Sequence, residues 1–120
     1  MPAADAWCRW EDALQPASPR FANEPPCYRL AFARLVTHYW SHGSWLEDGE
    51  VLAIAARLAG IPAVLVQGTL DLGNVIGTPW ALAAVWPGAE LRMVDAAHET
   101  GSTGMIDGLV EGTDRFAHDP

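Results

Sequence analysis

The stretch Ala63-Val-Leu-Val-Gln-Gly68-Thr-Leu-Asp71 decides the fold, because its apolar run closes on a glycine and an acidic residue follows at once. Such a run is typical of a strand that is buried on both faces of a sheet. A second run of this kind, Glu90-Leu-Arg-Met-Val-Asp95, follows further along the chain. Between the two, Pro79 and the apolar residues 80–86 predict a helix that crosses over to a parallel neighbour. We therefore expect an α/β fold built on a parallel βαβ unit with a right-handed crossover.

Asp71 and His98 each follow one of the two predicted strands. The carboxyl ends of parallel strands meet at one edge of a sheet, where open α/β sheets place their sites, so we expect the two side chains to lie side by side. A carboxylate that accepts a hydrogen bond from a histidine Nδ1–H leaves the other ring nitrogen free as a base, which supplies two members of a nucleophilic triad. Taken singly, Asp71 also fits a turn residue and His98 a loop histidine. Their joint placement favours the catalytic pair.

The third member of a triad, a nucleophilic serine, has no good candidate in the sequence. Ser44 is followed two residues later by Leu46, where a nucleophile elbow needs a glycine, and no buried strand precedes it. Ser102 comes after the second strand without the G-x-S-x-G spacing, so we interpret it as a helix N-cap. The pattern thus predicts the acid and the base of a triad but not its nucleophile.

Four segments carry a resemblance to a known family: Trp7-Cys-Arg-Trp-Glu11, Leu30-Ala-Phe-Ala-Arg-Leu-Val-Thr-His-Tyr-Trp40, Gly60-Ile-Pro-Ala-Val-Leu-Val-Gln-Gly-Thr-Leu-Asp71 and Asp95-Ala-Ala-His98. Together they resemble the C-terminal portion of the proline iminopeptidase (prolyl aminopeptidase) family of α/β-hydrolases. The resemblance implies a C-terminal fragment of an α/β-hydrolase fold, with a parallel βαβ pair flanked by helices and with part of a helical cap. It places part of the cap and a connecting loop in residues 1–43. The C-terminal βαβα portion of the hydrolase core falls in residues 44–120.

The same resemblance implies an activity and its site. The chain would be the C-terminal part of a serine peptidase that releases N-terminal proline from peptides, with Asp71 and His98 as catalytic residues. In this family the Trp-x-x-Trp-Glu segment belongs to the cap, so the resemblance assigns Glu11 to binding the α-amine of the peptide substrate. A carboxylate ringed by indoles attracts an ammonium group both by charge pairing and by cation–π interaction. The alternative interpretation of Glu11 is an ordinary solvated helix residue.

Three positions depart from the family pattern. Val36 stands where a second amine-binding glutamate is usual, and this weakens the case for strict aminopeptidase specificity. Thr69 replaces a usual arginine, which removes a positive charge near the expected site. Ala97 replaces a usual glycine and adds a Cβ to the backbone just before His98.

Composition argues against several classes of partner. The net charge of −8 offers no basic stripe that could neutralise phosphates, so we expect no nucleic acid partner. The first residues lack the features of a secretory leader, and no run approaches the ~20 apolar residues of a membrane span. We therefore expect no membrane contact and a cytoplasmic location. Cys8 and Cys27 are too few for a disulfide framework, and we interpret both as small buried side chains.

The sequence predicts neither a metal nor a cofactor. His38 and His42 lie four residues apart, a spacing that a metal site can use on a helix. The first histidine is not followed by the glutamate of a zincin motif, so we interpret the pair as packing or surface residues.

Helices are expected on either side of the βαβ unit. Residues 3–14 and 28–40 carry apolar side chains at helical spacing. Ser44 and Glu47 have the spacing of a capping box, which predicts a further helix from Ser44 to about Leu58.

A repeat of glycines marks the last predicted helix. Gly104, Gly108 and Gly112 recur every four residues and therefore share one face. A face without side chains lets another backbone approach closely, at a cost of roughly 1 kcal/mol of helix propensity per glycine.

Two functions from different classes remain open at this point. The first is a piece of a serine aminopeptidase, and the second is a non-catalytic remnant or binding module on an α/β-hydrolase scaffold. Half of the residues are hydrophobic and six are tryptophan, which is a large apolar load for 120 residues. Apolar surface beside an unpaired strand edge favours association. We therefore expect self-association, or a companion chain that supplies the serine.

Overall fold

The computed structural model describes residues 1–15, 19–73, 77–97 and 101–117. The chain divides into two compact units, Met1–Asp48 and Gly49–Pro120, and each is described by itself. The assignment of residues 1–43 to a cap and of residues 44–120 to a hydrolase core stays a prediction.

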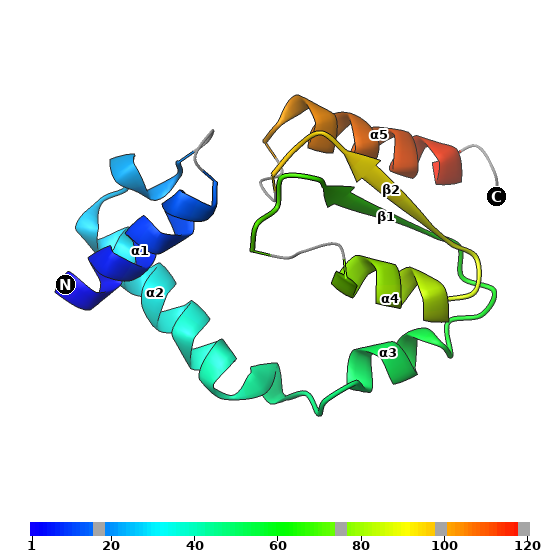
Figure 1. Cartoon of the computed structure of the whole chain (residues 1–120), viewed down its shortest axis with the longest axis horizontal. Coiled ribbons are helices and arrows are strands. Elements are labelled where there is room, and N and C mark those ends of the chain that lie inside the picture. Colours follow the sequence, from blue (N-terminus) through cyan, green and yellow to red (C-terminus); the bar gives the residue numbers. More distant parts are fainter. Residues whose placement is uncertain (16–18, 74–76, 98–100, 118–120) are drawn as a thin grey trace. The chain divides into compact units, whose positions relative to one another are not determined.

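The first unit is built on two helices, α1 (Pro2–Leu14) and α2 (Pro26–Ser41), as the apolar spacing predicts (Figure 1). Both helices carry proline in the first turn, where its missing N–H costs nothing. They pack through small buried side chains, namely Ala4, Cys8 and Ala33. An ion pair of 2.9 Å between Asp5 Oδ1 and Arg29 Nε joins the two helices.

The two cysteines of this unit differ in environment. Cys8 is 1% exposed, and burial raises the pKa of its thiol, so this side chain is an inert part of the core as expected. Cys27 is exposed, so the expectation that both cysteines are buried is wrong for this one. It occupies the first turn of α2, on a side that α1 does not cover.

The segment between α1 and α2 is organised by an acidic side chain. Asp12 Oδ1 accepts hydrogen bonds from the backbone N–H groups of Arg20 (2.7 Å) and Phe21 (2.9 Å). The short 3₁₀ helix η1 (Phe21–Asn23) follows. Phe21 is buried, and its ring centroid lies 4.5 Å from that of Phe32. Side-chain capping and one aromatic anchor therefore bring the chain back onto α1.

The predicted capping box does not form. Residues Gly43–Trp45 make a 3₁₀ turn, η2, in which Ser44 (φ 54°) and Trp45 (φ 57°) have left-handed backbone and no side-chain cap bond is present. The helix α3 (Glu50–Ala55) begins instead after Gly49, which has φ 79°. The Trp45 ring stacks on His42 at 5.3 Å, and this packing holds the turn in a conformation that cannot start a helix.

The second unit contains the predicted βαβ arrangement. Strands β1 (Ala63–Gly68) and β2 (Ala89–Val94) pair in parallel, in register from Ala63↔Ala89 to Gly68↔Val94. Helix α4 (Gly77–Val85) connects them, and α5 (Thr103–Ala117) follows β2 (Figure 1). The α/β class, with a parallel pair flanked by helices, is thus confirmed.

Helices α4 and α5 cover opposite faces of the strand pair. Successive side chains of a strand alternate between faces. Val64, Val66 and Val94 meet α5, whereas Leu91 and Met93 line a hollow together with α4 residues. Among the described residues, no helix combines the length and the apolar character that a bilayer crossing requires.

The glycine face of α5 packs on the strands, as the repeat predicts. A Cβ on Gly108 would lie 2.9 Å from Val66 Cγ1, and a Cβ on Gly112 would lie 3.4 Å from Val64 Cβ. Gly104 stands in the same way against the backbone of Asp95, with 3.1 Å to its carbonyl oxygen. The three glycines therefore bring α5 close to the sheet and to the loop after β2.

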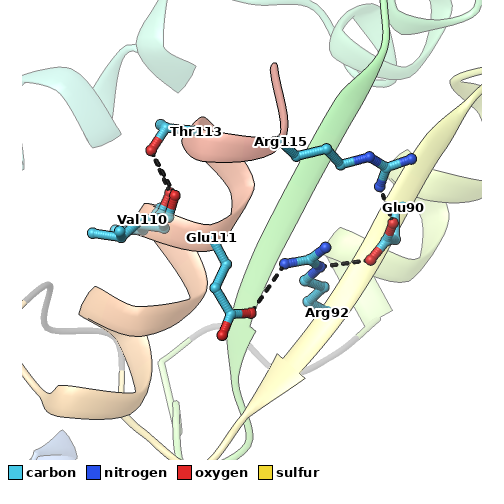
Figure 2. A network of polar contacts seen from close by, with 7 residues as sticks. Glu90, Arg92, Val110, Glu111, Thr113 and Arg115 are labelled. Atoms are coloured by element: carbon cyan, nitrogen blue, oxygen red, sulfur yellow. Dashed lines mark hydrogen bonds and ion pairs between the residues drawn. The ribbon is translucent and has the colours of Figure 1, made fainter. Parts of the chain in front are cut away.

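A surface network joins β2 to α5 at the edge of this contact (Figure 2). Glu90 accepts from Arg92 and from Arg115, and Arg92 also reaches Glu111 at 3.4 Å. The hydrogen bonds from the two arginines lower the pKa of Glu90. Because Glu111 and Arg115 are exposed and Glu90 and Arg92 are only partly buried, the network orients the helix more than it stabilises the fold.

Candidate active site at the strand ends

Asp71 lies just beyond the carboxyl end of β1, as predicted, and its side chain is turned inward. The residue is 8% exposed, which is unusual for a carboxylate in a loop. Its Oδ1 accepts a hydrogen bond of 3.0 Å from the backbone N–H of Gly73, and its own N–H points to Gly68 O at 3.4 Å. The turn that follows the strand therefore fixes one carboxylate oxygen.

Gln67, which no motif in the sequence marks, holds the other oxygen. Its Nε2 donates to Asp71 Oδ2 at 3.3 Å and to Gly68 O at 3.1 Å. The side chain is 7% exposed. The sequence signal that could have identified Gln67 is a single amide side chain near the end of an otherwise apolar strand. Such a group, if buried, needs hydrogen-bond partners nearby.

The loop after β1 and the loop after β2 are joined by backbone hydrogen bonds. Thr69 N–H donates to Val94 O (2.9 Å), and Leu70 N–H donates to Ala96 O (3.0 Å). A Cβ on Gly68 would lie 2.2 Å from the carbonyl oxygen of Ala96. Residues Ala96 and Ala97, which lead toward His98, thus lie against Gly68 at the end of β1, and Ala96 is hydrogen-bonded to Leu70, the residue before Asp71.

His98 lies outside the described residues, which stop at Ala97 on this side. The expected contact between Asp71 and His98 therefore stays a prediction. Ser102 directly precedes α5, and its carbonyl accepts from Ile106 N–H at 2.9 Å. Its hydroxyl oxygen is buried and has no hydrogen-bond partner among the described residues, so the expected side-chain cap is not seen there.

Glu11 lies in the first unit, on the last turns of α1, beside a cluster of indole rings. Its Oε1 accepts a hydrogen bond of 3.0 Å from Trp7 Nε1, one helical turn earlier. The rings of Trp7, Trp10 and Trp40 lie 5.3 to 6.5 Å apart with tilted or edge-on geometry. Glu11 is therefore held against an aromatic cluster, and its role in binding an amine stays a prediction.

Val36, which stands where the family usually has a second glutamate, lies on α2 on the same side as Trp40 of the indole cluster. Val36 is half-buried and stands one turn before Trp40, which is 61% exposed. The position that carries a second carboxylate in the resemblance thus offers only an apolar side chain, next to an indole.

The described residues contain no group of three side chains that could bind a metal ion. His38 and His42 do lie on one turn, with ring centroids 4.6 Å apart, and both are exposed. His42 Nδ1 is 2.7 Å from His38 O and its ring stacks on Trp45. The pair is accounted for by this packing at the end of α2.

Comparison with known proteins gives one consistent set of relatives. No family model matches the chain. It is 44% identical to a probable proline iminopeptidase of Streptomyces coelicolor, over 96% of this chain and 38% of that protein. It is 38% identical to a proline iminopeptidase of Neisseria meningitidis (92% and 36%) and 36% identical to one of Xylella fastidiosa (97% and 39%). The chain thus spans little more than a third of the length of the curated relatives it matches.

Proposed function

Because the chain corresponds over almost its whole length to the C-terminal part of proline iminopeptidases, we propose that it forms this part of a serine peptidase that releases N-terminal proline from peptides. The observation that supports the proposal most is the buried carboxylate of Asp71 at the end of β1. Its loop is hydrogen-bonded to the loop that leads toward His98. A triad acid belongs at this edge of a parallel sheet, which supports the assignment of Asp71, and the connected loop supports the assignment of His98 as its base.

In the proposed mechanism, Asp71 accepts a hydrogen bond from His98 Nδ1–H and leaves Nε2 free as the base. Nε2 takes the proton of a serine hydroxyl as its oxygen attacks the carbonyl carbon of the N-terminal prolyl residue. The imidazolium, stabilised by the Asp71 carboxylate, then gives the proton to the leaving amine. Water repeats the same steps on the acyl-enzyme and releases proline.

The substrate's α-amine is assigned to Glu11. At neutral pH the amine of an N-terminal proline is a secondary ammonium ion, which a carboxylate beside indole rings attracts. The hydrogen bond from Trp7 to Glu11 supports this role because it orients the carboxylate. Since Val36 offers no second carboxylate, the chain holds the ammonium ion with one charged group and relies more on the indoles.

The nucleophilic serine is proposed to come from outside these 120 residues, from another part of the protein or from a companion chain. The chain alone is then inactive toward prolyl arylamides. Labelling of Ser44 or Ser102 by a fluorophosphonate probe would show that the chain carries its own nucleophile. The alternative of a non-catalytic binding module predicts that Asp71 and His98 do not interact.

The pair is tested by an NMR titration of the histidines. A carboxylate beside an imidazolium favours the charged form, so the pKa of His98 should be lower in the Asp71→Asn variant than in the wild type. The measurement is the histidine Cε1–H chemical shift against pH in both proteins. Resonances of His38 and His42, which lie in the other unit, serve as internal references.

A matched control separates a specific contact from the loss of one negative charge. Asp95→Asn removes a carboxylate from the loop after β2, where Asp95 is exposed. It should change the pKa of His98 much less than Asp71→Asn does, because water screens an exposed charge. Equal small effects of both substitutions would mean that Asp71 and His98 do not meet, and the binding-module alternative would replace the peptidase.

A further inference from the structure

Gln67 is a buried amide in a position that packing alone would give to an apolar side chain. It is the last residue but one of β1 and is 7% exposed, directly opposite Met93 in the register. Burying an amide costs free energy unless its hydrogen-bonding groups find partners. Its presence at this point of the strand therefore needs an explanation in its contacts.

Two contacts of the amide nitrogen with described residues lie at the expected site. One hydrogen points to Gly68 O (3.1 Å) and the other to Asp71 Oδ2 (3.3 Å). Because both acceptors are oxygens, they need a hydrogen-bond donor, and the amide nitrogen is the only donor of the glutamine side chain. The amide therefore ties the carboxylate to the backbone at the end of β1.

The two oxygens of Asp71 are held by different elements. Oδ1 accepts from the backbone of Gly73, in the turn after the strand, whereas Oδ2 accepts from Gln67, in the strand itself. Two donors on opposite oxygens stop rotation of the carboxylate about its Cβ–Cγ bond. A neutral amide does this without cancelling the negative charge, as an arginine or a lysine would.

We propose that Gln67 is a positioning residue for the triad: it sets the orientation of the Asp71 carboxylate and thereby selects the Nδ1–H tautomer of His98. This inference rests on the proposed function, since it needs Asp71 and His98 to form a pair. In a triad the acid holds the imidazole in the tautomer whose other nitrogen can act as base. A carboxylate free to rotate holds that tautomer less well, because the hydrogen bond is directional.

The test measures the tautomer of neutral His98 from its two ring ¹⁵N chemical shifts in the whole chain. The reference variant is Asp71→Asn, which removes the carboxylate. The test variant is Gln67→Met, which keeps the unbranched shape of the side chain but has no donor. Leu65→Met, two residues earlier in β1, is the control for repacking of the strand.

We expect the Nδ1–H fraction of His98 to be high in the wild type and to drop in Asp71→Asn. In Gln67→Met it should move in the same direction, by a large part of that change, while Leu65→Met leaves it as it was. A second variant, Gln67→Asn, keeps an amide that is too short to reach Asp71 and should act like Gln67→Met. It carries the test if Gln67→Met does not fold.

Two failures can be told apart. If Asp71→Asn lowers the Nδ1–H fraction but both Gln67 variants match the wild type, the pair stands and the positioning role of Gln67 is overturned. If Asp71→Asn itself has no effect on His98, the proposed function and the role of Gln67 are overturned together. A drop in Leu65→Met as large as in Gln67→Met would also overturn the role, because repacking of β1 would explain it.

Discussion

At the scale of single residues, Gly68 shows how tightly the candidate site is built. The glycine closes β1, and the chain after β2 crosses over it so closely that a Cβ would lie 2.2 Å from Ala96 O and 2.3 Å from Ala97 O. A clash between a Cβ and backbone atoms at this distance cannot be relieved by rotating a side chain. The absence of a side chain at Gly68 is thus a condition for the two loops to be joined next to Asp71.

Gly68→Ala should therefore destabilise the protein by about 1–3 kcal/mol, the usual range for overpacking a tight site. Urea unfolding followed by circular dichroism measures the change. Gly77→Ala is the matched control, because a Cβ on Gly77 has nothing within 4 Å. That control should be neutral or slightly stabilising, and a Gly68→Ala variant as stable as the control would mean that the loops are not in contact.

At the scale of elements, α5 is placed by its glycine face and by charges at its edge. Gly108 and Gly112 lie over β1, and the glutamates and arginines of the surface network connect the same helix to β2 (Figure 2). The glycines lower helix propensity, so the close packing that they allow has to offset this cost. The loss of helix propensity and the gain from close packing are balanced differently at Gly108 and at Gly112.

Alanine substitutions in α5 should separate the two effects. At Gly112 a Cβ would make an ordinary contact of 3.4 Å with Val64, so Gly112→Ala should stabilise the protein by about 0.5–1 kcal/mol through propensity. At Gly108 it would lie 2.9 Å from Val66 Cγ1 and 3.2 Å from Val94 Cγ1, both on stiff β-branched side chains. Gly108→Ala should therefore destabilise by on the order of 1 kcal/mol. Thermal unfolding of the two variants checks this, and equal changes of one sign would contradict the packing of α5 on the sheet.

At the scale of the whole molecule, much apolar surface lies in contact with water. In the second unit Leu72, Trp80 and Met93 are 63%, 66% and 40% exposed, and the described strands form a pair in which each has one unpaired edge. Surfaces of this kind favour association. The net charge of −8 opposes it by mutual repulsion.

We therefore expect concentration-dependent self-association that increases with salt, because added ions screen the repulsion but not the apolar contact. Sedimentation velocity at several protein concentrations, at low and at physiological ionic strength, measures it. Trp80→Gln removes a large exposed indole without changing the charge and should reduce association. A concentration-independent monomer under all conditions would show that the exposed surface is inert.

The sequence by itself determined the elements and their order. Apolar runs and the helical period of 3.6 residues are local properties. The strands β1 and β2, the helices α1 and α2 and the glycine face of α5 therefore follow from the pattern, and so does the place of Asp71 after a strand. The tertiary structure decided what depends on contact. The capping box at Ser44 fails because the backbone of Ser44 and Trp45 is left-handed, in a turn where the ring of Trp45 stacks on His42. Gln67 meets Asp71 because the chain turns after Gly68, and this turn is hydrogen-bonded to the loop that follows β2. Local patterns carry no information on such encounters, since they depend on strand register and on which side chains the fold brings together.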